Sequence, residues 1–350
     1  MTKKKKSRKK SFVAFLVSIL AIAAIGCFYL IKSGFSNEEK AYIYIDKDDT
    51  CDSIRSKIEA NAKPEDMKVF DLFAKLLKLD ERKRTGKYEI TKDLSMLQLI
   101  RDIRNHNEVP VKMVVPSAVR TMNDMAGRVA KNLMIDSVAI ADYLNDEEKV
   151  KNLGYTKETI PALFIPNTYE VYWDMSIDDF FKRLVRENKN FWNESRKAKL
   201  AEVSEYAGQK MDEIAVVTLA SIVDSETANN GEKPTIAALY LNRLRTGMPL
   251  QSDPTVKFAL QNFALRRILF EHLKADSPYN TYKNTGLPPG PICVPSIAGI
   301  EAVLNHTKND YIYMCAKEDF SGTHNFSASY AQHLINAAKY SKALNDRNIH

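Results

Sequence analysis

The chain has 350 residues, of which 45% are hydrophobic, and a formal net charge of +7 at pH 7. This length predicts about two domains and allows more than one hydrophobic core. The positive charge comes from residues 3–10, KKKKSRKK: removing these seven from the 51 basic residues of the chain leaves 44, against 44 acidic residues. The balanced remainder lacks the clustered basic stripe of a nucleic-acid-binding protein, so we expect no nucleic-acid partner.

An uncharged apolar run, residues 12–31, follows the basic tail of residues 1–10. As a helix it would be about 30 Å long, which matches the hydrocarbon core of a bilayer. It stays apolar up to its end without a signal-peptidase site, so residues 11–32 are predicted to be an uncleaved anchor rather than a cleavable signal or a buried helix. The basic tail predicts a cytoplasmic N-terminus, an inner-membrane location and an extracytoplasmic remainder. The sequence AIGC leaves lipidation of Cys27 as an alternative.

The spacing of cysteines and histidines argues against several kinds of site. Outside the apolar run the cysteines are Cys51, Cys293 and Cys315, without a C-x-x-C pair. Two unpaired core thiols at Cys293 and Cys315 are favoured over a disulfide between them. The sequence has no H-E-x-x-H, P-loop, G-x-G-x-x-G or G-x-S-x-G motif. We therefore expect no metal and no cofactor.

After a polar linker at residues 33–40, the patterns predict an α+β fold. Residues 41–45 and 86–91 are typical of strands, and two stretches between them carry apolar residues at helical spacing. This gives a small unit with the order strand, helix, helix, strand. The next predicted elements are a helix over 95–105, a strand over 108–116 and a helix over 121–133.

The middle of the chain gives weaker signals. The aromatic-rich residues 161–175 predict a loop or a short pair of strands, in which core packing of the aromatic rings is favoured over stacking on sugar rings. An amphipathic helix is predicted over residues 176–195, with Ser176 or Asp178 as its N-cap.

The last third begins with an apolar helix predicted over residues 212–228. Glu226 continues its buried stripe, whereas Asp224 lies about 200° away around the helix. A carboxyl group on an apolar face is desolvated, which raises its pKa and suits a general acid. The alternative is a half-exposed Glu226 that merely pairs with Lys233 or Arg243.

Several elements are predicted beyond this helix. A second helix ends before Gly247, and a third begins with Ser252 or Asp253 as N-cap and Pro254 at its first position. A long irregular segment over residues 277–296, of a length that is often functional, follows. The remaining predictions are a helix over 296–307, a strand over 311–317, a turn over 322–327 and a helix over 328–344.

Four sequence motifs occur in a specific order: LASIVDSET, ALYLNRLRTGMPLQSDPTV, YNTYKNTGLPPGPI and GTHNFS. In this order and spacing they closely resemble the endolytic murein transglycosylases of the YceG-like family, and a more diffuse similarity extends over about residues 41–344. The resemblance implies a small LysM-like subdomain with connecting elements over residues 41–115. It also implies a larger α+β YceG-like catalytic domain over residues 116–350.

The resemblance assigns the catalytic acid and base to Glu226. The first acid of the family motif falls on Asp224, which is shorter than the usual Glu, and Asn167 stands where the family commonly has Asp. Both departures argue against catalytic roles at these positions. The resemblance implies that residues in the loop motifs bind glycan. The alternative is that they only stabilise the loops, with Asp253 as a helix N-cap. These residues are Gln251, Asp253, Asn280, Tyr282 and His324.

The implied reaction is cleavage of the bond between N-acetylmuramic acid and N-acetylglucosamine in nascent peptidoglycan strands. No water is consumed, and a 1,6-anhydro-muramyl end remains. The implied partners are glycan strands and the cell-wall synthesis machinery, including penicillin-binding proteins. Two alternatives are a lysozyme-like hydrolase, with Asp253 or Glu170 as the second carboxylate it needs, and a non-enzymatic, membrane-tethered glycan-binding scaffold.

Overall fold

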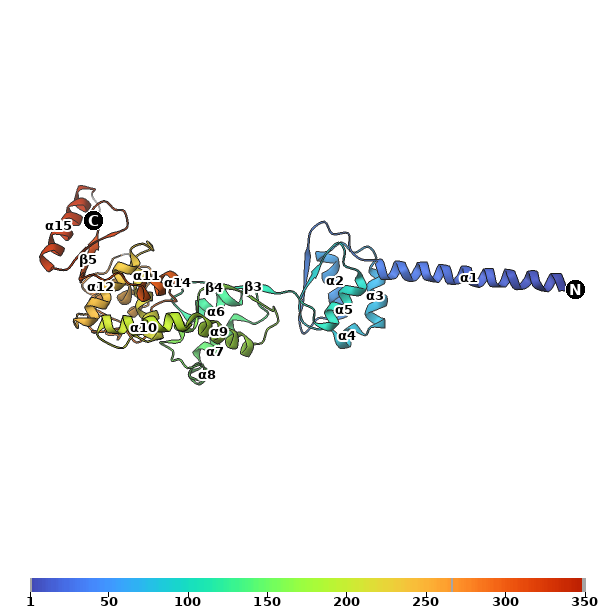
Figure 1. The fold of residues 1–350 in the computed structure, drawn as a ribbon, viewed down its shortest axis with the longest axis horizontal. Helices are drawn as coiled ribbons and strands as arrows, with labels where there is room; N and C mark the ends of the chain where they lie inside the picture. Colours follow the sequence, from blue (N-terminus) through green and yellow to red (C-terminus); the bar gives the residue numbers. More distant parts are fainter. Residues whose placement is uncertain (1, 266, 348–350) are drawn as a thin grey trace. The chain divides into compact units, whose positions relative to one another are not determined.

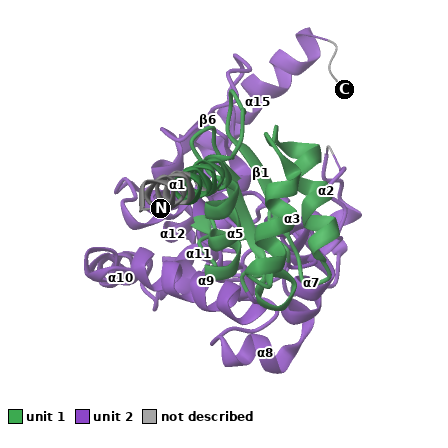
Figure 2. Ribbon diagram, turned by 90° about the vertical axis from the view of Figure 1, so that its right-hand side faces the viewer, with its two compact units in different colours: residues 1–112, 132–134, 170–175 green, residues 113–131, 135–169, 176–350 purple. Residues whose placement is uncertain are grey.

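The structure is a computed structural model that describes residues 2–265 and 267–347. The side chains of residues 2–14 and of Cys27 are outside the described part, so the alternative of a lipidated Cys27 falls there. The fold mixes helices and short strands, which confirms the predicted α+β class. The chain divides into two compact units (Figure 2). Unit 1 comprises Met1–Lys112, Asn132–Met134 and Glu170–Met175, and unit 2 comprises Met113–Lys131, Ile135–Tyr169 and Ser176–His350.

The first element of unit 1 is a long apolar helix, α1 (Thr2–Lys32) (Figure 1). Its segment Phe15–Lys32 is not buried against the rest of the protein and has a length and composition suited to crossing a membrane. Near its end, Leu30 packs against the core of unit 1. The prediction of one apolar N-terminal helix is therefore confirmed.

The remainder of unit 1 is built around a two-stranded antiparallel sheet. β1 (Ala41–Ile45) pairs with β2 (Gly86–Ile90), with Ala41 opposite Ile90. Alternate side chains of the strands enter the core, as the two-residue period of a strand requires. The predicted order of strand, helix, helix, strand is confirmed, with one short helix added. The helices are α2 (Cys51–Asn61), α3 (Met67–Leu76), α4 (Leu79–Arg82) and α5 (Met96–Asn105).

A second two-stranded sheet, β3 (Val111–Val115) with β4 (Asn167–Val171), contains two of the places where the chain passes from one unit to the other. The aromatic-rich segment predicted as a loop or a strand pair forms a short 3-10 helix and then β4. Ser176, one of the two predicted N-caps, accepts a hydrogen bond from the backbone N–H of Asp179 at the start of α9. The elements here are α6 (Met122–Ala130), α7 (Ser137–Asn145), α8 (Glu147–Asn152), η1 (Ile160–Leu163), α9 (Ile177–Phe191) and α10 (Glu194–Ala207).

The core of unit 2 is formed by three helices, α11 (Glu213–Glu226), α12 (Lys233–Arg245) and α14 (Ile297–Leu304), which pack against one another (Figure 1). Every residue of α11 from Val216 to Val223 is buried. A helix that is apolar on all sides is stable only inside a core. The predicted helix is confirmed, although it ends at Glu226 rather than at residue 228.

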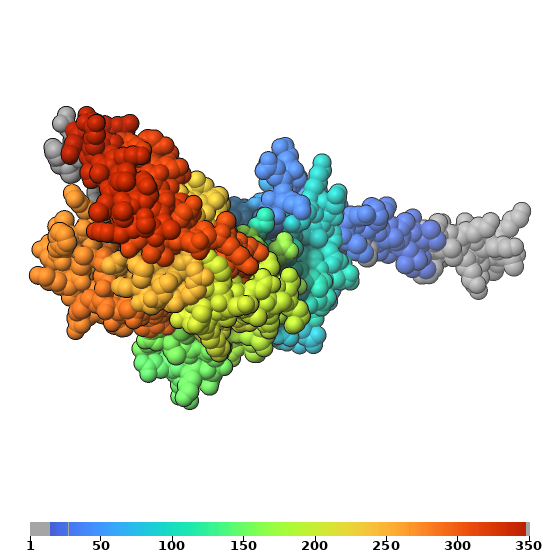
Figure 3. Space-filling model, turned by 60° about the vertical axis from the view of Figure 1, so that its left-hand side comes forward, coloured from blue at the N-terminus to red at the C-terminus, as the bar shows by residue number. Residues whose placement is uncertain are grey.

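The C-terminal part of unit 2 contains α13 (Asp253–Ala259), η2 (His272–Lys274), β5 (Tyr313–Ala316), β6 (His324–Ser327) and α15 (Tyr330–Asp346). The prediction of a simple turn over residues 322–327 is wrong in part, because β6 pairs with β5 in an antiparallel sheet. The C-terminal segment (red in Figure 3) covers surface beside the segment around residues 230–250 (gold). Hydrogen bonds from Asn242 to the carbonyl of Asn309 and from Arg243 to that of Ile312 hold the two segments together.

Candidate active site

The carboxyl group of Glu226 is held at the last position of α11 by two hydroxyl groups. The Tyr240 hydroxyl, from α12, donates to Glu226 Oε1 over 2.7 Å. The Ser252 hydroxyl, from the residue before α13, donates to the same oxygen over 2.5 Å. Two hydroxyl groups thus hold one carboxylate oxygen of Glu226, and the second oxygen takes no part in these bonds.

The surroundings of Glu226 raise the pKa of its carboxyl group. Burial is the main cause, because it disfavours the ionised form, and the negative charge of Asp253 adds to it. The hydrogen bonds from Ser252 and Tyr240 and the charge of His324 act in the opposite direction. Glu226 retains some exposed surface. It therefore carries a proton at pH values where an ordinary glutamic acid is ionised.

The basic residues considered as partners of Glu226 have other partners. Lys233 forms an ion pair with Asp224, with Nζ 2.7 Å from Oδ1. Arg243 donates to the backbone carbonyls of Leu250 and Ile312. The alternative of Glu226 as an ordinary ion-pair partner of Lys233 or Arg243 is contradicted by these contacts.

Asp224 has a structural role in the core of unit 2. It accepts hydrogen bonds from the backbone N–H of Ser296 over 2.5 Å and from its hydroxyl over 3.1 Å, at the N-cap of α14. A Cβ atom at Gly299 would come within 2.4 Å of Asp224 Oδ1, so α14 approaches closely because this residue is glycine. Asp224 thus joins Lys233 of α12 to α14, with its carboxylate fully engaged.

Ser252 is positioned by a link between two loops. Its backbone N–H donates to the Thr281 hydroxyl over 3.0 Å, and the N–H of Gln251 donates to the Thr281 carbonyl over 3.1 Å. Gln251 is exposed and has a φ of +50°, in the left-handed region that costs free energy for residues other than glycine. The surrounding contacts maintain this conformation directly beside the Ser252 hydroxyl.

Three other predicted binding residues lie near Ser252. Asp253 is the first residue of α13 and is exposed. Of the two predicted N-caps, Ser252 is therefore confirmed and Asp253 is wrong, and Pro254 is the second residue of the helix rather than the first. The Tyr282 hydroxyl donates to Asp253 Oδ1 over 2.6 Å. Asn280 is fully buried, and its amide donates to the carbonyls of residues 273 and 275, which holds the irregular segment together.

His324, at the start of β6, is oriented by Glu232. The backbone N–H of His324 donates to Glu232 Oε1 over 2.7 Å, and Nδ1 lies 2.9 Å from Oε2. Nδ1 therefore donates to this carboxylate, and Nε2 is the ring nitrogen left for another partner. The sequence did not predict Glu232 or Tyr240 as site residues, and it predicted Ser252 only as an N-cap, not as a partner of Glu226. The one usable signal was the position of Tyr240 in the apolar stretch 236–241 of α12.

The other sequence candidates lie outside this group. Glu170 belongs to unit 1, and Asn167 is the exposed first residue of β4. Cys293 and Cys315 are free thiols, as predicted, and burial raises the pKa of Cys293 to about 11. Among the described residues, the group placed to hold a metal ion lies in unit 1 and contains none of the residues around Glu226.

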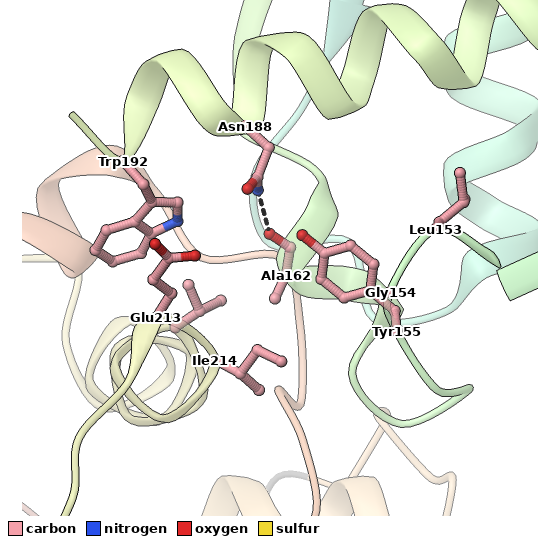
Figure 4. Close-up of a pocket in the computed structure, with 9 residues that line it drawn as sticks. Leu153, Gly154, Tyr155, Ala162, Asn188, Trp192, Glu213 and Ile214 are labelled. Atoms are coloured by element: carbon pink, nitrogen blue, oxygen red, sulfur yellow. Dashed lines mark hydrogen bonds between the residues drawn. The ribbon is translucent and has the colours of Figure 1, made fainter. Parts of the chain in front are cut away.

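A pocket of about 170 Å³ lies at the opposite end of α11 (Figure 4). Its lining includes Trp192, Tyr155 and Glu213, and Asn188 beside them donates to the Ala162 carbonyl over 2.8 Å. Glu213 is the first residue of α11, so about 20 Å of helix separate it from the last residue, Glu226. The pocket is therefore distinct from the Glu226 site.

A sequence model of the YceG-like family matches residues 43–339. The chain belongs to the YceG-like family. A crystal structure of a YceG-like protein from Listeria monocytogenes is similar to it, with a TM-score of 0.56, 25% sequence identity, and coverage of 85% of this chain and 99% of that one.

Two curated relatives are both named endolytic murein transglycosylase. The protein from Bacillus subtilis is 34% identical over 192 residues, which are 55% of this chain and 51% of that protein. The protein from Streptococcus pneumoniae strain R6 is 26% identical, over 89% of this chain and 62% of that protein. The chain thus spans between half and two thirds of the length of these relatives.

Proposed function

We propose that this YceG-like protein is an endolytic peptidoglycan lytic transglycosylase with Glu226 as its general acid and base. The observation that supports this most is the Glu226 carboxyl group, held by Tyr240 and Ser252 and protonated above the usual range of a glutamic acid. The other acid of the motif, Asp224, is engaged with Lys233. The names of the curated relatives point to the same reaction.

One carboxyl group suffices for the reaction. Glu226 donates its proton to the glycosidic oxygen between the N-acetylmuramic acid and N-acetylglucosamine residues as the bond to the anomeric carbon breaks. The 6-hydroxyl of the muramyl residue then bonds to the same carbon, and its proton passes to the Glu226 carboxylate. The sugar atoms balance without water, and Glu226 ends protonated, ready for the next cut.

The loops around Glu226 supply the groups that we propose bind the glycan. The proposed binding residues have exposed or partly exposed polar groups, and each is adjacent to Ser252 or interacts with Glu226 directly or through a neighbour. They are Gln251, Asp253, Tyr282 and His324. His324 keeps an imidazole nitrogen for a sugar hydroxyl. Asn280 instead acts through the shape of its segment, since its side-chain amide is bonded to backbone groups of residues 273, 275 and 282.

We further propose that α1 anchors the protein in the inner membrane with its N-terminus in the cytoplasm. The apolar span and the basic residues before it support this orientation. An anchored enzyme would meet glycan strands where they emerge from the membrane. Penicillin-binding proteins and other parts of the synthesis machinery are the partners proposed from the family resemblance.

The mass of the glycan products tests the reaction type. Purified full-length protein is incubated with uncrosslinked glycan strands, and the products are analysed by mass spectrometry. We expect internal cuts whose new muramyl ends are lighter by one water than reducing ends. Products with reducing ends alone would contradict the proposal.

A hydrolase is the second candidate, because the charge of Asp253 reaches Glu226 and raises its pKa. A hydrolase would use Asp253 to activate water or to form a covalent intermediate. In that case Asp253→Asn would abolish cleavage and the products would take up oxygen from labelled water. Under the proposal here, Asp253→Asn weakens glycan binding, and no label enters.

A further inference from the structure

Three metal-ligating side chains converge in unit 1, far along the chain from the motifs around Glu226. Ligand atoms of His106, Glu108 and Asp174 all lie within 4.8 Å of one another. His106 Nε2 is 3.1 Å from Glu108 Oε1 and 3.2 Å from Asp174 Oδ2. His106 and Glu108 follow α5, whereas Asp174 lies in the segment Glu170–Met175 that returns to unit 1.

The Glu108 carboxylate is buried with few partners: Oε2 accepts a hydrogen bond from the Lys87 backbone N–H over 3.3 Å, and Oε1 lies beside His106 Nε2 without a hydrogen bond from any residue that the structure describes. The Glu108 side chain is 2% exposed. A buried carboxylate normally has hydrogen bonds, an ion pair or a metal ion to offset its lost hydration. The carboxylate fits against β2 because residue 86 is glycine: a Cβ there would lie 2.7 Å from Glu108 Oε2.

The neighbouring Asp174 adds a second negative charge to the same place. Asp174 is 10% exposed, and the Thr85 hydroxyl donates to its Oδ2. Two carboxylates in contact repel each other when both are ionised, and a cation between them removes that cost.

The separations suit a small borderline metal ion. Zn²⁺ binds imidazole nitrogen and carboxylate oxygen at about 2.0–2.2 Å, so two ligand atoms at a tetrahedral centre are about 3.3–3.6 Å apart. The separations of 3.1 and 3.2 Å from His106 Nε2 lie just below this range. A ligand set with an imidazole favours Zn²⁺ over Ca²⁺ or Mg²⁺, which prefer oxygen.

We infer that His106, Glu108 and Asp174 form a Zn²⁺ site, with water as the fourth ligand, that fastens the segment Glu170–Met175 to the rest of unit 1. The site is separate from the proposed catalysis at Glu226. Its role is structural, since the ion would join residues 68 positions apart in the chain. It would thus fix the segment that begins at the end of β4, where the chain enters unit 1.

The inference is tested by measuring metal binding to the full-length protein. The protein is purified without a polyhistidine tag, and bound metal is removed with a chelator. We expect one Zn²⁺ per chain by calorimetric titration, a higher Tm with Zn²⁺, and slower amide exchange in residues 170–175. Glu108→Gln and Asp174→Asn should each weaken binding at least tenfold and abolish the Zn²⁺-dependent rise in Tm. His272→Ala, which removes a histidine of unit 2, is the matched control and should bind like wild type.

The inference is overturned if no stoichiometric binding occurs at micromolar Zn²⁺, or if both carboxylate variants bind Zn²⁺ like wild type. Preferential binding of Ca²⁺ would overturn it as well. Circular dichroism of the metal-free variants separates lost binding from lost folding, and Glu108→Gln preserves the side-chain shape. None of these readouts depends on glycan cleavage, so a failure here leaves the proposal for Glu226 unaffected.

Discussion

Tyr240 donates its hydroxyl hydrogen to Glu226 Oε1 over 2.7 Å, and this bond connects the end of α11 to the middle of α12. Tyr240 is 1% exposed. Its position is therefore set by the helix packing, and through it the core of unit 2 determines where the acid points. The site is positioned by a rigid core rather than by the loops alone.

Replacement of Tyr240 by phenylalanine tests this connection. The hydrogen bond stabilises the ionised carboxylate, so its loss raises the pKa of Glu226 further. Without this bond the Glu226 carboxyl group is also held less firmly. We expect kcat to fall about tenfold or more, which corresponds to the free energy of one hydrogen bond to a charged group. The alkaline limb of the pH profile should move to higher pH. Tyr206→Phe, which removes a hydroxyl bonded to the Asn309 carbonyl, is the control; an identical effect of both variants would contradict the assignment.

The raised pKa of Glu226 also predicts a pH-dependent stability. The folded state binds this proton more tightly than the unfolded chain, so the free energy of unfolding decreases as pH rises from about 4.5 through the raised pKa. Glu226→Gln removes the cost of ionising this buried carboxyl group. Urea denaturation at pH 7 should therefore show that the variant is more stable than wild type. The difference should vanish below pH 4.5, where both states are protonated. The same substitution at exposed Glu148 is the control, and a variant less stable than wild type at pH 7 would contradict the prediction.

The ion pair between Asp224 and Lys233 should matter for folding rather than for chemistry. Their side chains are 12% and 7% exposed. Removing one partner of a buried pair leaves the other charge uncompensated, so Asp224→Asn or Lys233→Met should each lower the free energy of unfolding by about 3–5 kcal/mol. The double variant should lose less than the sum of the two. Chemical denaturation measures these values, and single effects below about 1 kcal/mol would show that the pair is not needed.

The contact between Glu232 and His324 predicts an effect on substrate binding. Glu232→Gln keeps the size of the side chain but loses the charged acceptor for the His324 backbone and imidazole. We expect KM for glycan strands to rise several-fold with little change in kcat, because His324 is proposed to bind substrate rather than to react. Steady-state kinetics with defined strands measures both. A fall in kcat at constant KM would instead place His324 in the chemical step.

Local patterns in the sequence predicted many of the elements that carry the site. The strands of unit 1 and the buried helix α11 have strong periodicities, so their existence was predictable even though their ends shifted. α10 was missed because its buried residues are few, Val203 and Ala207 in fourteen positions. β6 was taken for a turn because GTHNFS contains turn-forming residues, and only its pairing with β5 makes it a strand.

The partners of Glu226 depend on tertiary structure. Tyr240 and Ser252 are 14 and 26 residues away along the chain, and helix packing brings their hydroxyl groups to one oxygen. Spacing placed Asp224 on another face of the helix from Glu226, but its ion pair with Lys233 was not predictable. The expectation of no metal site rested on local motifs. Such motifs contain only residues that are close in sequence, whereas Glu108 and Asp174 lie on separate segments.

The comparison of Glu226→Gln with Glu213→Gln tests the central claim most directly. Both residues lie on α11, at its two ends, and burial raises the pKa of each. Glycan strands are incubated with each variant, and the 1,6-anhydro-muramyl ends are counted by mass spectrometry while strand binding is measured separately. We expect Glu226→Gln to bind strands but produce no anhydro ends, with Glu213→Gln close to wild type. Undiminished anhydro products from Glu226→Gln would contradict the assignment of the acid and base to this residue.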